Sequence, residues 1–386
     1  MVQPDDTSAT RQKPPRFEVL IAGGGVAGLE AAFALGELAG DRVSLTVLAP
    51  GAEFVYRPDA VSEPFTRGYA RPYPLAALAA EAGAELVQGA LDCVDVDRRL
   101  AYTTAGAQLS YDALLLALGA QLGERYEHVT TVDDARIDEH LHGLVQDVEE
   151  GYVKRLAFIV PAPMPWPLPA YELALLTAQR AWEMGTQLSV TILTPERAPL
   201  IVFGESASRE VAQLLSHRGI EVITSAYCEI PKAQTINVSP GGRQLEFDRI
   251  VALPELHGPA LTGIPQIGGG FIPVDEFCHV RGADRVYAAG DATDFPVKHG
   301  GIAAQQADTA AQSIAALAGA PVMPRTFDPV LEGVLVTGDQ PRYFRVDLTE
   351  GYGSDQEVVG VPVAASTPKI AARYLAAHLE RQTPKP

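Results

Sequence analysis

A glycine-rich turn near the start of the chain restricts the possible folds more than any other feature of the sequence. An apolar run over 17–22 leads directly into Gly-Gly-Gly-Val-Ala-Gly at 23–28, and an alanine-rich stretch with helical periodicity follows over 29–38. Residues 42–48 then have the composition of a second strand. This order of strand, glycine loop, helix and strand predicts the phosphate-binding unit of a Rossmann fold.

Three of the glycines are in register with the pattern G-x-G-x-x-G, and each has its own expected task. Gly23 permits a tight turn, Gly25 leaves room for a pyrophosphate, and Gly28 lets the helix pack close to the strand. The helix N-terminus would offer its N–H groups to the phosphates. The acidic residue that usually ends the second strand and holds the adenosine ribose is replaced by Ala49 or Pro50, so we expect backbone groups to hold the ribose.

The rest of the chain has the pattern of an α/β protein with a second module of the same kind. A strand over 155–160, a helix over 170–183 and a strand over 188–193 form the second βαβ unit. Other helices are expected over 134–150, 204–217, 301–317 and 368–381, and other strands over 220–224, 249–253, 285–289 and in the segment from 326 onward. The polar first fifteen residues predict a disordered tail.

The segment Val-Tyr-Ala-Ala-Gly-Asp-Ala-Thr at 286–293, followed by a long helix, resembles the second FAD motif of the pyridine nucleotide–disulfide oxidoreductase superfamily. The resemblance implies that Asp291 hydrogen-bonds the ribityl chain of FAD and that Gly290 lets the backbone approach. It also implies that the helix start around Gly301 and Ile302 directs N–H groups at the flavin pyrimidine ring. Such a positive helix end would stabilise negative charge on the reduced ring.

Two further segments follow the order of that family. Leu-Leu-Leu-Ala-Leu-Gly-Ala at 114–120 resembles the motif where the chain leaves the FAD domain, with Leu118 in place of the usual threonine, and Phe-Val-Tyr-Arg-Pro at 54–58 resembles the segment whose arginine lies along FAD. The expected FAD contacts are Gly23, Gly24, Gly25, Val26, Ala27, Gly28, Arg57, Leu91, Ala117, Gly119, Gly290, Asp291, Gly301 and Ile302.

The resemblance implies an α/β fold with two Rossmann-like, three-layer ββα domains. The expected divisions are a FAD domain discontinuous in sequence, 16–125 and 256–325, a degenerate NAD-type domain, 126–255, and a C-terminal segment, 326–386. The family branches that the chain resembles most are the type II NADH dehydrogenases and the sulfide:quinone reductases.

The second module lacks the glycines that bind NADH in such relatives. Its first strand runs into the loop 161–169, which contains five prolines and no glycine. Each proline removes an N–H donor and stiffens the backbone, so a standard pyrophosphate cradle is not expected. Two interpretations stay open: a rigid structural loop, or a reshaped pocket in which Trp166 faces the flavin or a substrate other than a nicotinamide.

The three cysteines, Cys93, Cys228 and Cys278, form no C-x-x-C pair and have no zinc-ligand spacing. They are interpreted as structural residues, which disfavours sulfide oxidation through a cysteine persulfide and disulfide reduction. No metal site is predicted.

Two polar residues are candidates for catalysis. Glu172 matches a glutamate that lies near the flavin and quinone in type II NADH dehydrogenases, and the alternative is an acid that caps the N-terminus of its own helix. His299 could relay a proton, and the alternative is a loop histidine with a backbone partner.

The net charge of −18 disfavours binding to nucleic acid or to an anionic membrane surface. The sparse cysteines and the lack of a long apolar run suit a cytoplasmic protein without a transmembrane segment. The apolar pairs of the closing helix, Ile370 with Tyr374 and Leu375 with Leu379, favour a core or homodimer contact over a membrane anchor.

The leading hypothesis is a FAD-dependent oxidoreductase that passes electrons from an unidentified donor to a quinone or another small acceptor, without a cysteine redox pair. One alternative is a type II NADH:quinone dehydrogenase with an atypical NADH loop. The other is a flavin-binding sensor or partner protein without catalytic turnover.

Overall fold

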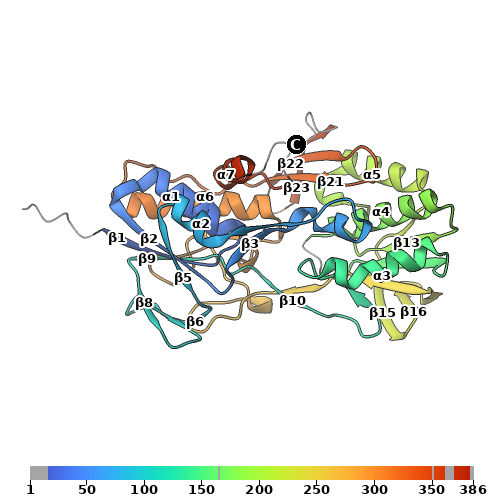
Figure 1. Ribbon diagram of the computed structural model, residues 1–386, viewed down its shortest axis with the longest axis horizontal. Coiled ribbons are helices and arrows are strands. Elements are labelled where there is room, and N and C mark those ends of the chain that lie inside the picture. Colours follow the sequence, from blue (N-terminus) through green and yellow to red (C-terminus); the bar gives the residue numbers. More distant parts are fainter. Residues whose placement is uncertain (1–15, 164–165, 350–351, 361–368, 383–386) are drawn as a thin grey trace, which may run out of the picture.

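The computed structural model describes residues 16–163, 166–349, 352–360 and 369–382, and two parallel five-stranded sheets organise it (Figure 1). The expected disordered tail, 1–15, lies outside the described residues. The α/β fold with two Rossmann-like units is confirmed. The domain boundaries given above stay a prediction.

The first sheet has the strand order β20-β9-β1-β2-β5, and all of its neighbours are parallel. Its strands are β1 (Phe17–Ala22), β2 (Val43–Ala49), β5 (Ala84–Gln88), β9 (Ala113–Leu116) and β20 (Val286–Ala288). Strand β20 therefore joins this sheet only after the whole second module has passed. The sheet is discontinuous in sequence, as the resemblance implied.

Two helices cover one face of this sheet, α1 (Val26–Ala39) and α6 (Gly300–Leu317) (Figure 1). Both are rich in buried alanines, whose small side chains let helix backbones approach closely. The antiparallel sheet β6 (Leu91–Asp95), β7 (Leu100–Thr103) and β8 (Gln108–Ser110) lies against the other face through a separate apolar cluster. This gives the three-layer ββα arrangement.

The second sheet has the order β11-β18-β12-β13-β14 and is also parallel. Its strands are β11 (Thr130–Thr131), β12 (Arg155–Ile159), β13 (Ser189–Leu193), β14 (Glu221–Ile223) and β18 (Arg249–Ala252). Its helices are α3 (Ile137–Glu149), α4 (Leu168–Met184) and α5 (Glu205–His217), and a smaller antiparallel sheet packs on it, β15 (Tyr227–Lys232), β16 (Thr235–Ser239) and β17 (Arg243–Glu246).

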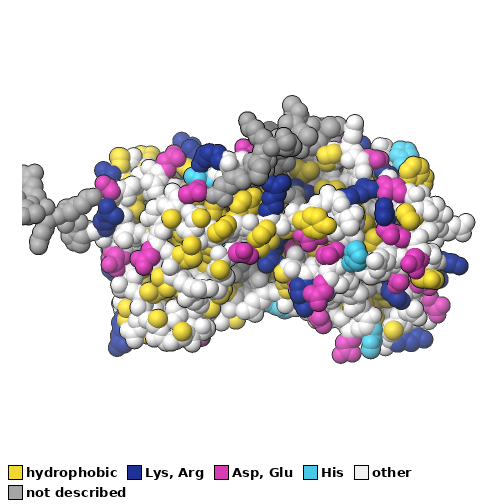
Figure 2. Space-filling view, viewed as in Figure 1, with side chains coloured by type: hydrophobic (Ala, Val, Ile, Leu, Met, Phe, Trp, Pro, Cys, Tyr) yellow, Lys and Arg dark blue, Asp and Glu magenta, His cyan; other side chains and the backbone are white. Residues whose placement is uncertain are grey.

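Shorter elements extend the first module or lie between the two modules. They are β3 (Glu53–Tyr56), the 3₁₀ segment η2 (Arg57–Phe65), β4 (Arg71–Pro74), α2 (Leu75–Glu81), β10 (Gln121–Gly123) and β19 (Glu255–His257). Strands β10 and β19 pair antiparallel at the crossover between the modules. The face seen in Figure 2 intersperses acidic and basic side chains over the second module, which is typical of a solvated surface.

The C-terminal segment forms an antiparallel sheet and a short helix. Its elements are β21 (Val330–Leu335), β22 (Arg342–Thr349), β23 (Tyr352–Gly360) and α7 (Leu375–Gln382). Within the described part of the chain, no helix combines the length and the apolar character needed to cross a bilayer.

The prediction of a closing helix over 368–381 is wrong at its start. Helix α7 begins only at Leu375, and residues 370–374 are not helical, while Pro368 lies outside the described residues. The physical reason is a cap from another element, because the Glu30 carboxylate on α1 accepts the N–H groups of Tyr374 and Leu375. Ile370 and Tyr374 are therefore not an i, i+4 pair on one helix.

Candidate functional site

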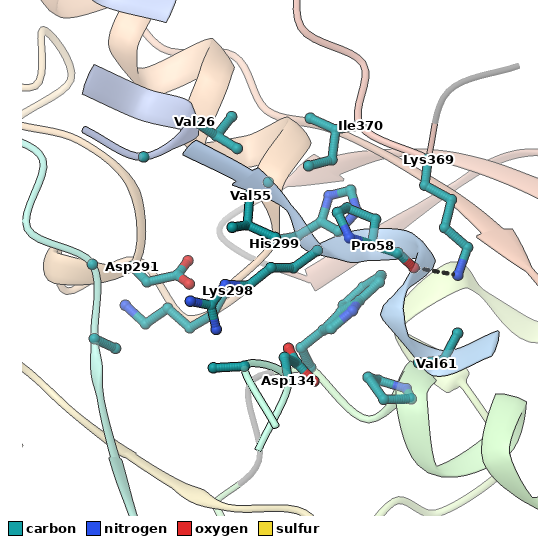
Figure 3. Close-up of a pocket in the computed structure, with 18 of the residues that line it drawn as sticks. Val26, Val55, Pro58, Val61, Asp134, Asp291, Lys298, His299, Lys369 and Ile370 are labelled. Atoms are coloured by element: carbon teal, nitrogen blue, oxygen red, sulfur yellow. Dashed lines mark hydrogen bonds between the residues drawn. The ribbon is translucent and has the colours of Figure 1, made fainter. Parts of the chain in front are cut away.

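A cavity of about 730 Å³ lies where the first module, the second module and the C-terminal segment meet (Figure 3). The loop after β1 contributes Gly24, Gly25 and Val26, and the loop before α6 contributes Lys298, His299 and Gly300. The second module contributes the loop and first turns of α4, and the C-terminal segment contributes Lys369 and Ile370.

The glycine loop is shaped by close backbone contacts on one side and by open space on the other. Gly23 has φ 125°, and a Cβ there would lie 2.0 Å from the Ala117 carbonyl oxygen. A Cβ on Gly28 would lie 1.9 Å from the Gly23 carbonyl oxygen, whereas a Cβ on Gly25 would meet no chain atom within 4 Å. Gly23 and Gly28 are thus needed by the fold, and Gly25 borders the cavity.

The N-terminus of α1 faces this open space, and no described residue caps it with a side chain. No side chain caps the helix at Gly25, and its first turn contains no acidic residue. An uncapped helix N-terminus presents N–H groups and the positive end of the helix dipole, which together favour an anionic group.

Asp291 and Lys298 lie side by side in the cavity (Figure 3). Burial raises the pKa of the Asp291 carboxyl, and the nearby ammonium of Lys298 partly opposes this. Burial lowers the pKa of Lys298 to about 8. Its Nζ donates to the Thr293 carbonyl oxygen and lies 4.2 Å from the centre of the Phe271 ring. Lys298 was not predicted as a site residue, although its position next to His299 and before two glycines could have indicated it.

His299 has the backbone partner that one interpretation of the sequence gave it. Its Nδ1 accepts the N–H of Gly301 at 3.2 Å, so the neutral ring carries its proton on Nε2. Burial lowers the pKa of His299 to about 4, which keeps the ring neutral near pH 7. The Trp166 ring packs against it with 4.5 Å between ring centroids. A role in proton relay stays a prediction.

Glu172 forms a buried ion pair that links three parts of the chain. Its Oε1 accepts from Lys369 Nζ at 2.7 Å and from the N–H of Val336 at 2.9 Å, and the Glu172 residue is only 1% exposed. Lys369 Nζ also donates to the Pro58 carbonyl oxygen at 2.9 Å (Figure 3). Glu172 therefore reaches beyond its own helix, and Lys369 is a site residue that the sequence analysis missed.

The structure brings most of the predicted residues together. Those that line the cavity are Gly24, Gly25, Val26, Arg57, Gly119, Glu172, Asp291 and His299. Those that adjoin it without lining it are Gly23, Ala27, Gly28, Ala117, Gly290, Gly301 and Ile302. Leu91 lies on β6, partly buried against an apolar cluster outside the cavity lining.

Comparisons with known proteins agree with this geometry. A family model described as pyridine nucleotide-disulphide oxidoreductase matches residues 171–313. A sulfide:quinone oxidoreductase structure from Aquifex aeolicus superposes with a TM-score of 0.79 at 18% identity, covering 89% of this chain and 86% of that chain. The family model and the shared fold make the chain similar to the pyridine nucleotide-disulphide oxidoreductases.

Two other solved structures share the fold. A ferredoxin reductase from Rhodopseudomonas palustris has a TM-score of 0.65 at 18% identity, over 86% of this chain and 82% of that chain. A NAD-dependent persulfide reductase from A. fulgidus has a TM-score of 0.62 at 19% identity, over 86% of this chain and 64% of that chain. Among curated protein sequences, no significant match was found. The family match and the shared fold support an FAD-dependent oxidoreductase.

The residues of the cavity fit FAD. The open space at Gly25 and the uncapped start of α1 suit its pyrophosphate, and the buried Asp291 carboxylate suits a ribityl hydroxyl. Helix α6 also begins without an acidic residue in its first turn, so its positive end suits the electron-rich edge of the flavin. When bound, FAD supplies the redox chemistry, and the chain supplies binding, orientation and electrostatics.

Removal of the Asp291 carboxylate is expected to weaken FAD binding without abolishing it. A charge-assisted hydrogen bond contributes about 1.5–3 kcal/mol, so Asp291→Ala should lower FAD affinity by roughly one to two decades. Fluorescence titration of the apoprotein with FAD measures this. Wild-type affinity in Asp291→Ala would show that the ribityl chain is held elsewhere.

In the second module, a hydrogen-bonded pair of side chains lies near the carboxyl ends of two central strands. The carboxyl ends of β12 and β13 are the place where a second dinucleotide would bind in such a sheet. There, Glu196 accepts from the Tyr171 hydroxyl at 2.6 Å and from the Thr194 hydroxyl at 2.9 Å. Burial raises the pKa of Glu196 to about 7, and the Tyr171 side chain is fully buried.

The loop 161–169 places Trp166 in the cavity, and that it faces the flavin or a substrate there stays a prediction. Trp166 lines it together with Leu168 and Pro169, and it packs edge-on against Phe203 at 5.7 Å between ring centroids. Residues 164 and 165 of this loop lie outside the described residues.

The cysteines lie away from the cavity lining. All three are free thiols, Cys93 on β6, Cys228 on β15 and Cys278 in the buried core of the first module. Burial raises the pKa of Cys228 to about 12 and also raises that of Cys278. A thiol held neutral in this way is a poor nucleophile.

Proposed function

We propose that this flavoprotein transfers electrons from a donor other than NADH or NADPH to a quinone or another small acceptor. The observation that carries the proposal is the buried Glu172–Lys369 ion pair in the same cavity as Gly25 and Asp291. Taking a charged pair out of water costs free energy, and clefts that hold such groups are often reactive sites.

The lining around the ion pair suits a flat and largely apolar acceptor. Its apolar members are Val61, Trp166, Leu168, Val334 and Ile370. Reduction of a quinone to a quinol takes up two electrons and two protons. Lys369 Nζ can donate a hydrogen bond to a carbonyl oxygen, and Glu172 and His299 can hold or deliver protons at the same wall of the cavity.

The second module supports the part of the proposal that concerns the donor. The Tyr171–Glu196 pair lies at the ends of β12 and β13, and the prolines of 161–169 remove N–H donors from the adjoining loop. A second pyrophosphate would therefore lack its usual partners. Each missing hydrogen bond to a charged phosphate costs about 1.5–3 kcal/mol.

We accordingly expect NADH and NADPH to be poor reductants of the bound FAD. In an anaerobic titration followed at the flavin absorbance band, micromolar NADH should leave the flavin oxidised. The same sample, reduced with one equivalent of dithionite, should be reoxidised by a water-soluble quinone.

The other outcomes of this titration separate the alternatives. Fast and saturable bleaching by micromolar NADH would restore the interpretation as a type II NADH dehydrogenase. If no quinone reoxidises the reduced flavin, and no reductant tried supports steady-state turnover, the result would favour a flavin-binding sensor.

A further inference from the structure

A carboxylate outside the cavity is buried on the helix that follows the glycine loop. Glu30 lies two residues after Gly28 and is 0% exposed. Its two oxygens accept the N–H groups of Tyr374 at 2.9 Å and Leu375 at 2.6 Å. Glu30 on α1 thus caps α7 from another element, and the positive end of α7 stabilises its charge.

Charged groups from each neighbouring element surround Glu30. Asp308 approaches from α6, and Arg373 from the C-terminal segment. Burial raises the pKa of Glu30, although its backbone hydrogen bonds and Arg373 oppose this. Among the described residues, the buried Oδ1 atom of Asp308 has no hydrogen-bond partner.

From this cap, the chain leads back into the cavity through residues 369–375, here named the strap. Ile370 donates its N–H to the Tyr56 hydroxyl at 3.0 Å. Its side chain packs on Gly300, where a Cβ would lie 2.5 Å from Ile370 Cδ1. The next residue toward the cavity is Lys369, which reaches Pro58 and Glu172. The strap is pinned at one end by Glu30 and enters the cavity at the other.

We propose that Glu30 is a positioning residue that fixes the strap and thereby sets Lys369 against Glu172. This inference rests on the proposed function, because it gives the Glu172–Lys369 pair a part in reduction of the acceptor. Glu30 does not line the cavity, and it holds the strap through the backbone of residues 374 and 375 and through its interactions with Arg373.

The test compares variants in a single-turnover reaction that needs no knowledge of the donor. Wild type, Glu30→Ala, Glu30→Gln and Lys369→Met, each loaded with FAD, are reduced with dithionite and mixed with a water-soluble quinone in a stopped-flow instrument. Glu81→Gln is the matched control, because Glu81 contacts His378 of α7 at 3.2 Å on the exposed surface and not the strap. Amide hydrogen exchange of 369–382 is measured in parallel.

We expect Glu30→Ala to slow reoxidation to within about threefold of the Lys369→Met rate and to raise exchange throughout 369–382, while α1 exchanges as in wild type. Glu30→Gln keeps one acceptor oxygen and should lie between Glu30→Ala and wild type. Glu81→Gln should reoxidise at the wild-type rate. The double variant Glu30→Ala/Lys369→Met should be no slower than Lys369→Met alone, because both changes remove the same contact, that of Lys369 with Glu172.

Two results would overturn the inference. In one, Lys369→Met slows reoxidation while both Glu30 variants keep the wild-type rate and exchange. In the other, the effects of Glu30→Ala and Lys369→Met add in the double variant. A wild-type rate in Lys369→Met itself would instead contradict the proposed function.

Discussion

Gly25→Val should fold normally and be purified without FAD. A Cβ at this position meets no chain atom within 4 Å, and the backbone φ of −86° is open to any L-residue, so the fold has no need of glycine here. The branched side chain would instead fill the space that suits the pyrophosphate. We expect FAD affinity to fall by more than about 100-fold, equivalent to about 3 kcal/mol.

The measurements are the ratio of flavin to protein absorbance after purification and the far-ultraviolet circular dichroism of the protein. Gly143→Val is the matched control, because Gly143 is exposed on α3 and a Cβ there also meets nothing within 4 Å. Full flavin content in Gly25→Val would place the pyrophosphate elsewhere. Gly28→Val should behave differently and lose its fold, because its Cβ would collide with the Gly23 carbonyl oxygen.

Lys369→Met should lower the free energy of unfolding by about 3–5 kcal/mol, because it leaves the Glu172 carboxylate buried without its cation. Methionine has a similar length and fills the same space, so the loss reflects charge more than packing. Urea unfolding followed by circular dichroism measures the change.

The double variant Glu172→Gln/Lys369→Met decides whether this reason is correct. It removes both charges and should recover most of the lost stability. Its quinone-dependent reoxidation should nevertheless stay slow, because the charged groups that we assign to the acceptor are gone. A double variant as unstable as Lys369→Met would show that Lys369 stabilises the protein through its contact with Pro58 instead.

Prediction from the sequence was most accurate for elements and motifs whose residues are adjacent in the chain. The glycine loop, its strand and its helix are one continuous segment, and the strand over 17–22 was predicted at its observed bounds. The predicted helix over 204–217 likewise differs from α5 by one residue. Local periodicity and turn chemistry determine such elements.

Prediction failed where a distant side chain decides the local structure. Nothing near Leu375 indicates that α7 begins there, because the capping carboxylate is Glu30. Lys369 is similarly an ordinary lysine in sequence, and its burial depends on Glu172 and Pro58 from other modules. The Tyr171–Glu196 pair of the second module is also visible only after β12, β13 and α4 have assembled.

The discontinuity of the first sheet has a consequence for the order in which the protein is made. As the chain leaves the ribosome, β1, β2, β5 and β9 emerge early, but β20 and Asp291 follow only after the whole second module. The second module, continuous in sequence, can fold while the first sheet still lacks its edge strand and the cofactor still lacks its ribityl partner. We therefore expect FAD capture to be among the last events of biosynthesis, and nascent chains arrested before β20 to carry no flavin.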